Sequence, residues 1–179
     1  MKKATVLNQY GLLACYYDQF FIFHLDWYRR ARRIVLGKIL PHVGSVCDLA
    51  CGTGTTALEL ASRGIKAFAV DLSPIMCRIT RQKAIRARAK ISVLRGDMRT
   101  FRLPEPVDLI TCEFDAVNHV PKKSDLSRVA KAASRAMRPG GYFYFDVNNR
   151  MAFQKIWPGT WETETPAVKL IMTGGYDRA

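Results

Sequence analysis

Residues 46–54 read Val-Cys-Asp-Leu-Ala-Cys-Gly-Thr-Gly, an apolar run that leads into a loop with two glycines. The run predicts a β-strand over Ser45–Ala50 that is buried on both faces, because it is close to continuously apolar. The glycines allow a tight turn and let the backbone approach a ligand at the N-terminus of a helix predicted over Thr55–Arg63. The stretch therefore predicts the first strand, loop and helix of an α/β sheet.

The rest of the chain repeats this alternation of strands and helices. Four more short apolar runs predict strands at Ala67–Asp71, Ile91–Arg95, Val107–Cys112 and Tyr142–Val147. Ser73 before Pro74 predicts the start of a helix that runs to about Ala89. Ser124 is predicted to cap a later helix that Pro139-Gly140-Gly141 ends. The predicted fold class is α/β, a doubly wound and mostly parallel sheet, with N-terminal helices in residues 5–40.

Length and composition favour one globular domain. The chain has 179 residues, 49% apolar and 24% charged, which argues against disordered, collagen-like and coiled-coil proteins. Its 28 basic and 15 acidic residues give a net charge of +13. Six bases lie between Arg78 and Lys90, and four arginines lie between Arg29 and Arg33. These basic clusters allow contact with nucleic acid, although such a run is more often a solvated helix face.

The cysteines and the apolar segments indicate the compartment. Five cysteines are present with no Cys-x-x-Cys pair and no histidine at zinc spacing, so reduced thiols, no metal site and a cytoplasmic location are predicted. The longest charge-free stretch near the N-terminus, Ala4–Tyr17, is shorter than the roughly 18 apolar residues that a spanning helix needs. No membrane contact is predicted.

Acidic residues follow the predicted strands where a parallel sheet binds its ligands. Gly52-x-Gly54-x-x-Ala57 formally matches the dinucleotide fingerprint, and Asp71 ends the second strand at roughly the required distance. However, a carboxylate about 4 Å from a phosphate costs about 4 kcal/mol at an effective dielectric constant of about 20. S-adenosylmethionine suits acidic strand ends better, because it has a sulfonium, an ammonium and a ribose but no phosphate.

Five segments together resemble the class I S-adenosylmethionine-dependent methyltransferases. They are Val46–Gly54, Val70–Met76, Gly96–Met98, Val107–His119 and Arg138–Asp146. Tyr17-Asp18 and Asn118-His119 resemble motifs of the small bacterial methyltransferases of that superfamily, and the resemblance covers about residues 10–179. Ala50 departs from the family pattern, which often has glycine there.

The resemblance implies a role for each matching residue. It assigns the methionine part of the cofactor to the loop from Asp48 to Gly54, the ribose to Asp71, and the adenine to Leu72, Met76, Asp97 and Met98. Glu113 or Phe114 would close the floor of the site. The cofactor-binding residues so implied are Tyr17, Asp48, Ala50, Cys51, Gly52, Gly54, Asp71, Leu72, Met76, Asp97, Met98, Glu113 and Phe114. His119 is the first candidate for a general base, ahead of Glu113 and Tyr17, if the acceptor arrives protonated.

The expected function is methyl transfer to a small-molecule acceptor. Three alternatives stay open: an RNA methyltransferase, a cofactor-binding fragment without turnover, and an NAD-dependent oxidoreductase. Within one domain, residues 1–40 form an N-terminal helical cap, 41–147 the cofactor-binding core and 148–179 the start of a substrate-covering segment.

The C-terminal region is expected to be incomplete. The resemblance implies seven strands, whereas the residues after Val147 offer one convincing strand, Val168–Met172. The chain is therefore expected to be shorter than the functional unit, and the edge of the fifth strand is expected to be open to self-association. In the competing arrangement, Val168–Met172 folds back on that edge or a second copy covers it, which gives a compact enzyme.

Overall fold

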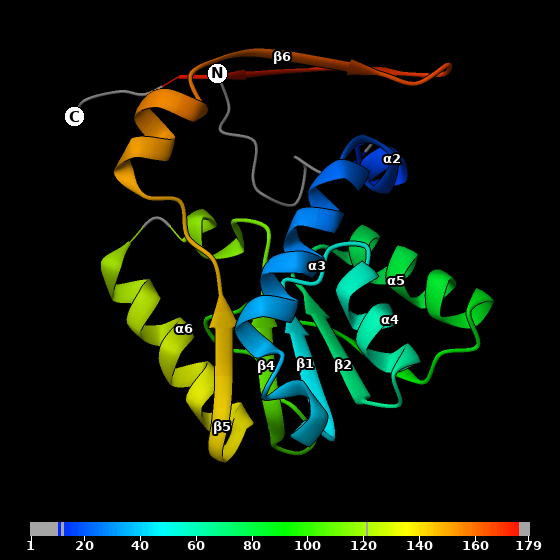
Figure 1. The fold of residues 1–179 in the computed structure, drawn as a ribbon, viewed down its shortest axis with the longest axis vertical. Helices are drawn as coiled ribbons and strands as arrows, with labels where there is room; N and C mark the ends of the chain where they lie inside the picture. The colour runs from blue at the N-terminus through cyan, green and yellow to red at the C-terminus, as the bar shows by residue number, and fades with distance from the viewer. Residues whose placement is uncertain (1–10, 12, 121, 176–179) are drawn as a thin grey trace.

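The computed structural model describes residues 11, 13–120 and 122–175, and its centre is a five-stranded sheet (Figure 1). The strands are β1 (Ser45–Leu49), β2 (Lys66–Asp71), β3 (Ile91–Arg95), β4 (Val107–Cys112) and β5 (Met137–Phe145). Every neighbouring pair is parallel, in the order β3-β2-β1-β4-β5. The five predicted strands are present, and the predicted fold class is confirmed.

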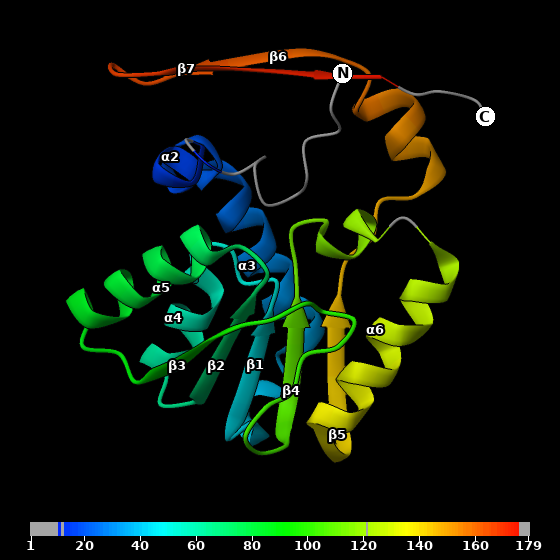
Figure 2. The same ribbon diagram turned by 180° about the vertical axis from the view of Figure 1, so that it is seen from behind.

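Helices cover both faces of the sheet. They are α2 (Leu13–Phe20), α3 (Ile22–Leu36), α4 (Thr55–Ser62), α5 (Pro74–Arg86) and α6 (Lys123–Ala136), with short turns η1 (Leu40–His42) and η2 (Ala116–His119). Helices α3 and α4 lie on one face and α6 on the other, as Figures 1 and 2 show together. The strand order reverses between β1 and β4, so a ligand site is expected at the carboxyl ends of these two strands.

The centre of the sheet supplies the core. All five residues of β1 are buried, and Val46, Leu109 and Ile110 have no exposed surface. Full burial of an aliphatic side chain of this size contributes about 1.5–3 kcal/mol. The continuously apolar run that predicted β1 thus reflects a strand with helices on both sides.

The helix starts were predicted with mixed success. Ser73 caps α5 as predicted, since its hydroxyl accepts a hydrogen bond from the amide of Met76 at 3.4 Å and Pro74 is the first helical residue. The predicted cap at Ser124 is wrong, because α6 begins at Lys123 and its N-cap residue, Lys122, makes no side-chain cap bond. The acidic residue of its first turn, Asp125, instead places negative charge near the free amides of the helix start.

The boundary between α6 and β5 also differs from the prediction. The helix ends at Ala136, and Met137 already pairs with Val107 in the sheet. The pairing of β4 with β5 shifts register between Val107 and Leu109. In the facing part of β5, Gly140 takes a φ of +79°. Pro139-Gly140-Gly141 therefore forms an irregularity within the strand rather than the end of the helix.

Beyond β5 the chain forms a hairpin of its own. A short π-helical turn, η3 (Ala152–Ile156), leads to β6 (Gly159–Glu164) and β7 (Lys169–Gly174), which pair antiparallel. The strand at Val168–Met172 was predicted, but its partner β6 was missed because its threonines and glutamates hide the alternation. The competing arrangement, in which this strand covers β5, is wrong. Figures 1 and 2 place the hairpin beyond the carboxyl ends of the sheet strands.

Among the described residues, β5 pairs with β4 on one side alone, and self-association through its other edge stays a prediction. None of the described helices has the length and apolar character that crossing a bilayer requires. The described part of the chain contains no cluster of three or more metal-ligating side chains. The predicted helical residues 5–10 and 12 lie outside the described ranges.

Candidate active site

The loop between β1 and α4, residues 50–54, has an unusual backbone, and we call it the glycine loop. Ala50, Gly52 and Gly54 adopt left-handed conformations with φ of +57°, +53° and +78°. Such a conformation costs a residue with a Cβ about 1–2 kcal/mol. The left-handed φ at Ala50 explains physically why glycine suits this position. Gly54 is the N-cap residue of α4 and packs against Thr80. It lines neither of the two cavities described below.

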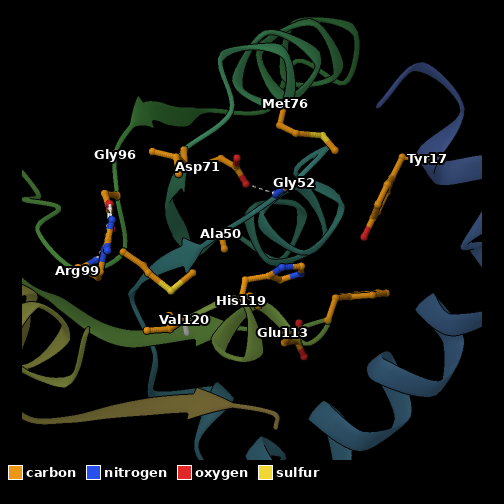
Figure 3. Close-up of a pocket in the computed structure, with 15 residues that line it drawn as sticks. Tyr17, Ala50, Gly52, Asp71, Met76, Gly96, Arg99, Glu113, His119 and Val120 are labelled. Carbon is orange, nitrogen blue, oxygen red and sulfur yellow. Dashed lines mark hydrogen bonds and ion pairs between the residues drawn. The ribbon is translucent and has the colours of Figure 1, made fainter. Parts of the chain in front are cut away.

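Two adjoining cavities lie at the carboxyl ends of the strands. The large cavity, of about 350 Å³ (Figure 3), is lined by Tyr17, Ala50, Gly52, Asp71, Leu72, Met76, Gly96, Asp97, Met98, Arg99, Glu113, Phe114, Ala116, His119 and Val120. The small cavity, of about 50 Å³, is lined by Tyr17, Asp18, Phe21, Asp48, Ala50, Cys51, Gly52, Thr53, Thr55, Thr56, Glu113 and Phe114. Together they contain every predicted site residue except Gly54.

Asp71 at the end of β2 connects two loops. Its Oδ2 accepts the amide of Gly52 and its Oδ1 accepts the amide of Ser73, each at 2.8 Å. Burial raises its pKa. Each carboxylate oxygen can accept a further hydrogen bond, so Asp71 can hold the loops and still bind a ligand hydroxyl.

Asp97 after β3 is paired with an arginine that the sequence analysis missed. The Nε of Arg99 lies 2.9 and 3.1 Å from the two oxygens of Asp97, and its Nη2 lies 2.6 Å from Oδ2. Another nitrogen, Nη1, donates to Asp125 at 3.0 Å. The hydrogen bonds from Arg99 lower the pKa of Asp97. The part of the cavity wall around Asp97 is therefore less negatively charged than the acidic strand ends suggested.

Asp48 in β1 is buried beneath the glycine loop. Its Oδ2 accepts the amide of Ala57 at 3.1 Å and its Oδ1 accepts the hydroxyl of Thr111 at 2.9 Å. Burial raises its pKa to about 6. The carboxylate thus braces the start of α4 and forms an acidic wall of the small cavity.

Glu113 after β4 lines both cavities and is only 5% exposed. Its Oε2 accepts the hydroxyl of Thr56 at 3.1 Å and lies 3.6 Å from Nη1 of Arg32, which is also buried. Its Oε1 is buried without a hydrogen-bond partner. Burial raises the pKa of Glu113 to about 7.

Helix α2 closes one side of the cavities through a polar contact. Lys83 of α5 lies 2.7 Å from Asp18 of α2 and 2.8 Å from the hydroxyl of Thr55, and Thr53 donates to Asp18 from the glycine loop. This contact, the Asp18–Lys83 latch, fixes the helix that carries Tyr17. Figure 3 shows Tyr17 across the cavity from Asp71.

Aromatic and imidazole groups complete the wall. Phe114 stacks on Tyr28 of α3 with ring centroids 4.0 Å apart. His119 lies on η2, and its imidazole projects into the large cavity in Figure 3. Four further residues line the large cavity and were not predicted from the sequence: Gly96, Arg99, Ala116 and Val120. Arg99 follows Asp97 by two residues, so a local acid–base pair was the signal that could have found it.

Comparison with known proteins identifies a family and several curated relatives, of which two are described here. Residues 46–141 match a family described as a methyltransferase domain. The chain is 31% identical over 120 residues to YqeM of Bacillus subtilis (strain 168), which covers 66% of this chain and 48% of that protein. It is 34% identical over 118 residues to dTDP-4-amino-2,3,4,6-tetradeoxy-D-glucose N,N-dimethyltransferase of Saccharopolyspora spinosa, covering 65% and 46%.

A solved structure gives the same assignment. An S-adenosylmethionine-dependent methyltransferase from Clostridium acetobutylicum ATCC 824 superposes with a TM-score of 0.74 at 26% identity, covering 89% of this chain and 66% of that one. The chain spans about half the length of the curated relatives that it matches. Since the family match extends over more than half of its 179 residues, the chain belongs to the class I S-adenosylmethionine-dependent methyltransferases.

Proposed function

We propose that this chain binds S-adenosylmethionine in the two cavities and transfers its methyl group to a small-molecule acceptor. The observation that carries the proposal is a large cavity joined to a small one across the glycine loop, with Asp71 in the wall of the large cavity. This arrangement offers the large cavity to a nucleoside and the small one to an amino acid.

The residues present suit the chemistry of this cofactor. The ribose hydroxyls would bind Asp71, and the adenine would lie among Leu72, Met76 and Met98. The ammonium would be near Asp48, whose carboxylate lines the small cavity. The same carboxylate disfavours a pyrophosphate there, because two anions in a site of low dielectric constant repel each other strongly.

The protein's own part in the reaction is alignment and the exclusion of water. When bound, the cofactor supplies an activated methyl group. Tyr17 and Phe114 shield the junction of the cavities, and alignment of reacting groups can lower a barrier by about 7–11 kcal/mol. His119 projects into the large cavity and would accept a proton from an acceptor that arrives protonated.

A small-molecule acceptor fits the site better than nucleic acid. The Saccharopolyspora relative is named for the methylation of a nucleotide-linked amino sugar. Part of the basic charge is used within the fold, since Arg32 pairs with Glu59 at 3.4 Å and Lys83 forms the Asp18–Lys83 latch. These pairs reduce the charge that the basic clusters could offer to a phosphate backbone.

Ligand binding tests the proposal first, and turnover tests it second. In isothermal titration calorimetry, S-adenosylmethionine and S-adenosylhomocysteine should bind in the micromolar range, and NAD should not bind. Mass spectrometry should then detect methylated products in a panel of amino sugars, phenols and short RNAs. Binding of NAD alone would overturn the cofactor assignment, and methylation of RNA alone would overturn the acceptor class.

Asp71→Ala should weaken binding of S-adenosylhomocysteine by about 1.5–3 kcal/mol, the range for hydrogen bonds to a charged group. Asp108→Ala is the matched control, because Asp108 also accepts two backbone amides, from Gly44 and Ser45, but lines neither cavity. Calorimetry on both variants measures the effect. Equal affinities for the two variants would show that Asp71 does not contact the ligand.

Asp18→Ala should weaken binding about fivefold, because a partly exposed charged pair contributes up to about 1 kcal/mol. The change releases Tyr17 from its place over the cavities by breaking the Asp18–Lys83 latch. Glu162→Ala, which breaks the exposed pair with Lys169 in the hairpin, serves as the control. Unchanged affinity in Asp18→Ala would mean that α2 does not cover the ligand.

A further inference from the structure

One acidic residue lies where the two cavities meet. The residues that line both cavities are Tyr17, Ala50, Gly52, Glu113 and Phe114, and Glu113 is the carboxylate among them. In S-adenosylmethionine the sulfur joins the nucleoside to the amino acid. If these parts occupy the large and small cavities, as proposed above, the sulfonium lies at the junction beside Glu113.

The hydrogen bonds of the acidic wall distinguish Glu113 from the other carboxylates. Both oxygens of Asp71 accept backbone amides, and Asp97 is paired with Arg99. Both oxygens of Asp48 also have donors. Glu113 has a buried oxygen, Oε1, that accepts no hydrogen bond. A buried and unpaired carboxylate oxygen is costly, so this group is stabilised by a proton or by a nearby cation.

We infer that Glu113 is the residue by which this site distinguishes a cationic sulfonium from a neutral thioether. In the free protein Glu113 carries a proton for much of the time near neutral pH. Binding of the sulfonium stabilises the carboxylate, and the proton passes to the buffer. S-adenosylhomocysteine has no charge on sulfur and leaves this proton in place. The inference rests on the proposed function and adds a residue that favours the methyl donor over its product.

The groups around Glu113 agree with this exchange. Burial and the charges of Asp48 and Asp146 raise its pKa, whereas Arg32 and the hydroxyl of Thr56 lower it, with a net value of about 7. The other titratable groups that sense its charge are Cys112, Tyr28 and Tyr144. None of these three carries a positive charge. Arg32 is thus the cation paired with Glu113, and it is shared with Glu59. Arg99 and His119 line the large cavity together with Glu113.

The effect of pH on ligand affinity follows from the direction in which a bound cation shifts the pKa of Glu113. A cation at the junction lowers the pKa of Glu113 in the complex below its value in the free protein. Affinity for S-adenosylmethionine relative to S-adenosylhomocysteine should therefore rise with pH as the free carboxyl loses its proton, and should level off above pH 7. The expected rise is about five- to tenfold between pH 6 and pH 8.

Calorimetry of the wild-type chain tests the inference without an acceptor. Each ligand is titrated at pH 7 in phosphate and in Tris, whose ionisation enthalpies differ, so that the protons exchanged on binding can be counted. We expect S-adenosylmethionine to release about half a proton more than S-adenosylhomocysteine. Equal proton release by the two ligands would overturn the inference while leaving the proposed function intact. No binding of either ligand would overturn the proposed function itself.

Two glutamate-to-glutamine substitutions test whether Glu113 is the group that releases the proton. Glu113→Gln should remove the difference in proton release and the pH-dependent preference, while Arg32 keeps its pair with Glu59. Glu105→Gln, at an exposed residue paired with Lys66 at the opposite end of the sheet, should change neither. A proton difference that persists in Glu113→Gln would assign it to another group. Should Glu113→Gln not fold, the two-buffer measurement on the wild-type chain still decides.

Discussion

Gly54→Ala is expected to destabilise the fold by about 2–5 kcal/mol and to abolish binding of S-adenosylhomocysteine. An added Cβ would clash with Cγ2 of Thr80 and lie 2.9 Å from its Oγ1, and the residue has a φ of +78°. The left-handed conformation costs about 1–2 kcal/mol and the overpacking about 1–3 kcal/mol. Moving Thr80 also disturbs its 2.9 Å hydrogen bond to the carbonyl of Gly52. Urea denaturation and calorimetry measure the two effects.

Two further variants separate the causes at Gly54. Gly64 has a φ of +83° but no atom near its added Cβ, so Gly64→Ala should show the conformational cost alone and leave binding unchanged. Adding Thr80→Ser to Gly54→Ala removes the closest methyl group and keeps the hydroxyl, so stability should recover in part. A Gly54→Ala protein as stable as Gly64→Ala would contradict the close contact with Thr80.

Asp48→Asn is expected to stabilise the ligand-free protein at pH 8 by up to about 3 kcal/mol while weakening cofactor binding at least tenfold. Burial raises the pKa of Asp48 to about 6 in the folded state, above its usual value of 3.8. The folded state therefore favours the protonated form, and stability declines as pH rises from about 4 through 6. The shift corresponds to about 3 kcal/mol at neutral pH, or about 6–12 °C in melting temperature.

Thermal melting of both proteins at pH 5 and pH 8 tests the prediction for Asp48. The advantage of Asp48→Asn should be about half as large at pH 5 as at pH 8. Asp108→Asn is the matched control, because its hydrogen bonds to Ser45 and Arg138 help to lower the pKa of Asp108, so this change should destabilise the protein at pH 8. A lower melting temperature for Asp48→Asn than for wild type at pH 8 would contradict the assignment of a buried charge.

The sequence predicted the sheet because the local signals and the tertiary structure agree there. The strands β1 and β4 are buried on both faces and read as continuous apolar runs. The acids that end neighbouring parallel strands must meet at one edge, which is why Asp48, Asp71 and Asp97 could be grouped without a structure. The hairpin strand β6 was missed because it is mostly exposed, so its sequence carries little burial pattern.

The pairing of charges could not be predicted, since it depends on side-chain directions and on distant elements. Arg32 and Glu113 are far apart in sequence, yet Nη1 of Arg32 lies 3.6 Å from Oε2 of Glu113 and both side chains are buried. Lys83 belongs to a basic cluster that suggested nucleic acid, but it binds Asp18 of α2. The acidic wall inferred from the strand ends is therefore partly neutralised, while Glu113, predicted to bind the cofactor and to be an alternative general base, has the unpaired oxygen.

A crystal structure of this chain with S-adenosylhomocysteine tests the central claim most directly. We expect the ribose hydroxyls within hydrogen-bonding distance of the Asp71 carboxylate and the adenine between Met76 and Met98. We also expect the sulfur to lie beside Glu113, at the junction of the two cavities. A ligand bound elsewhere on the chain, or bound with its amino acid part in the large cavity, would contradict the account.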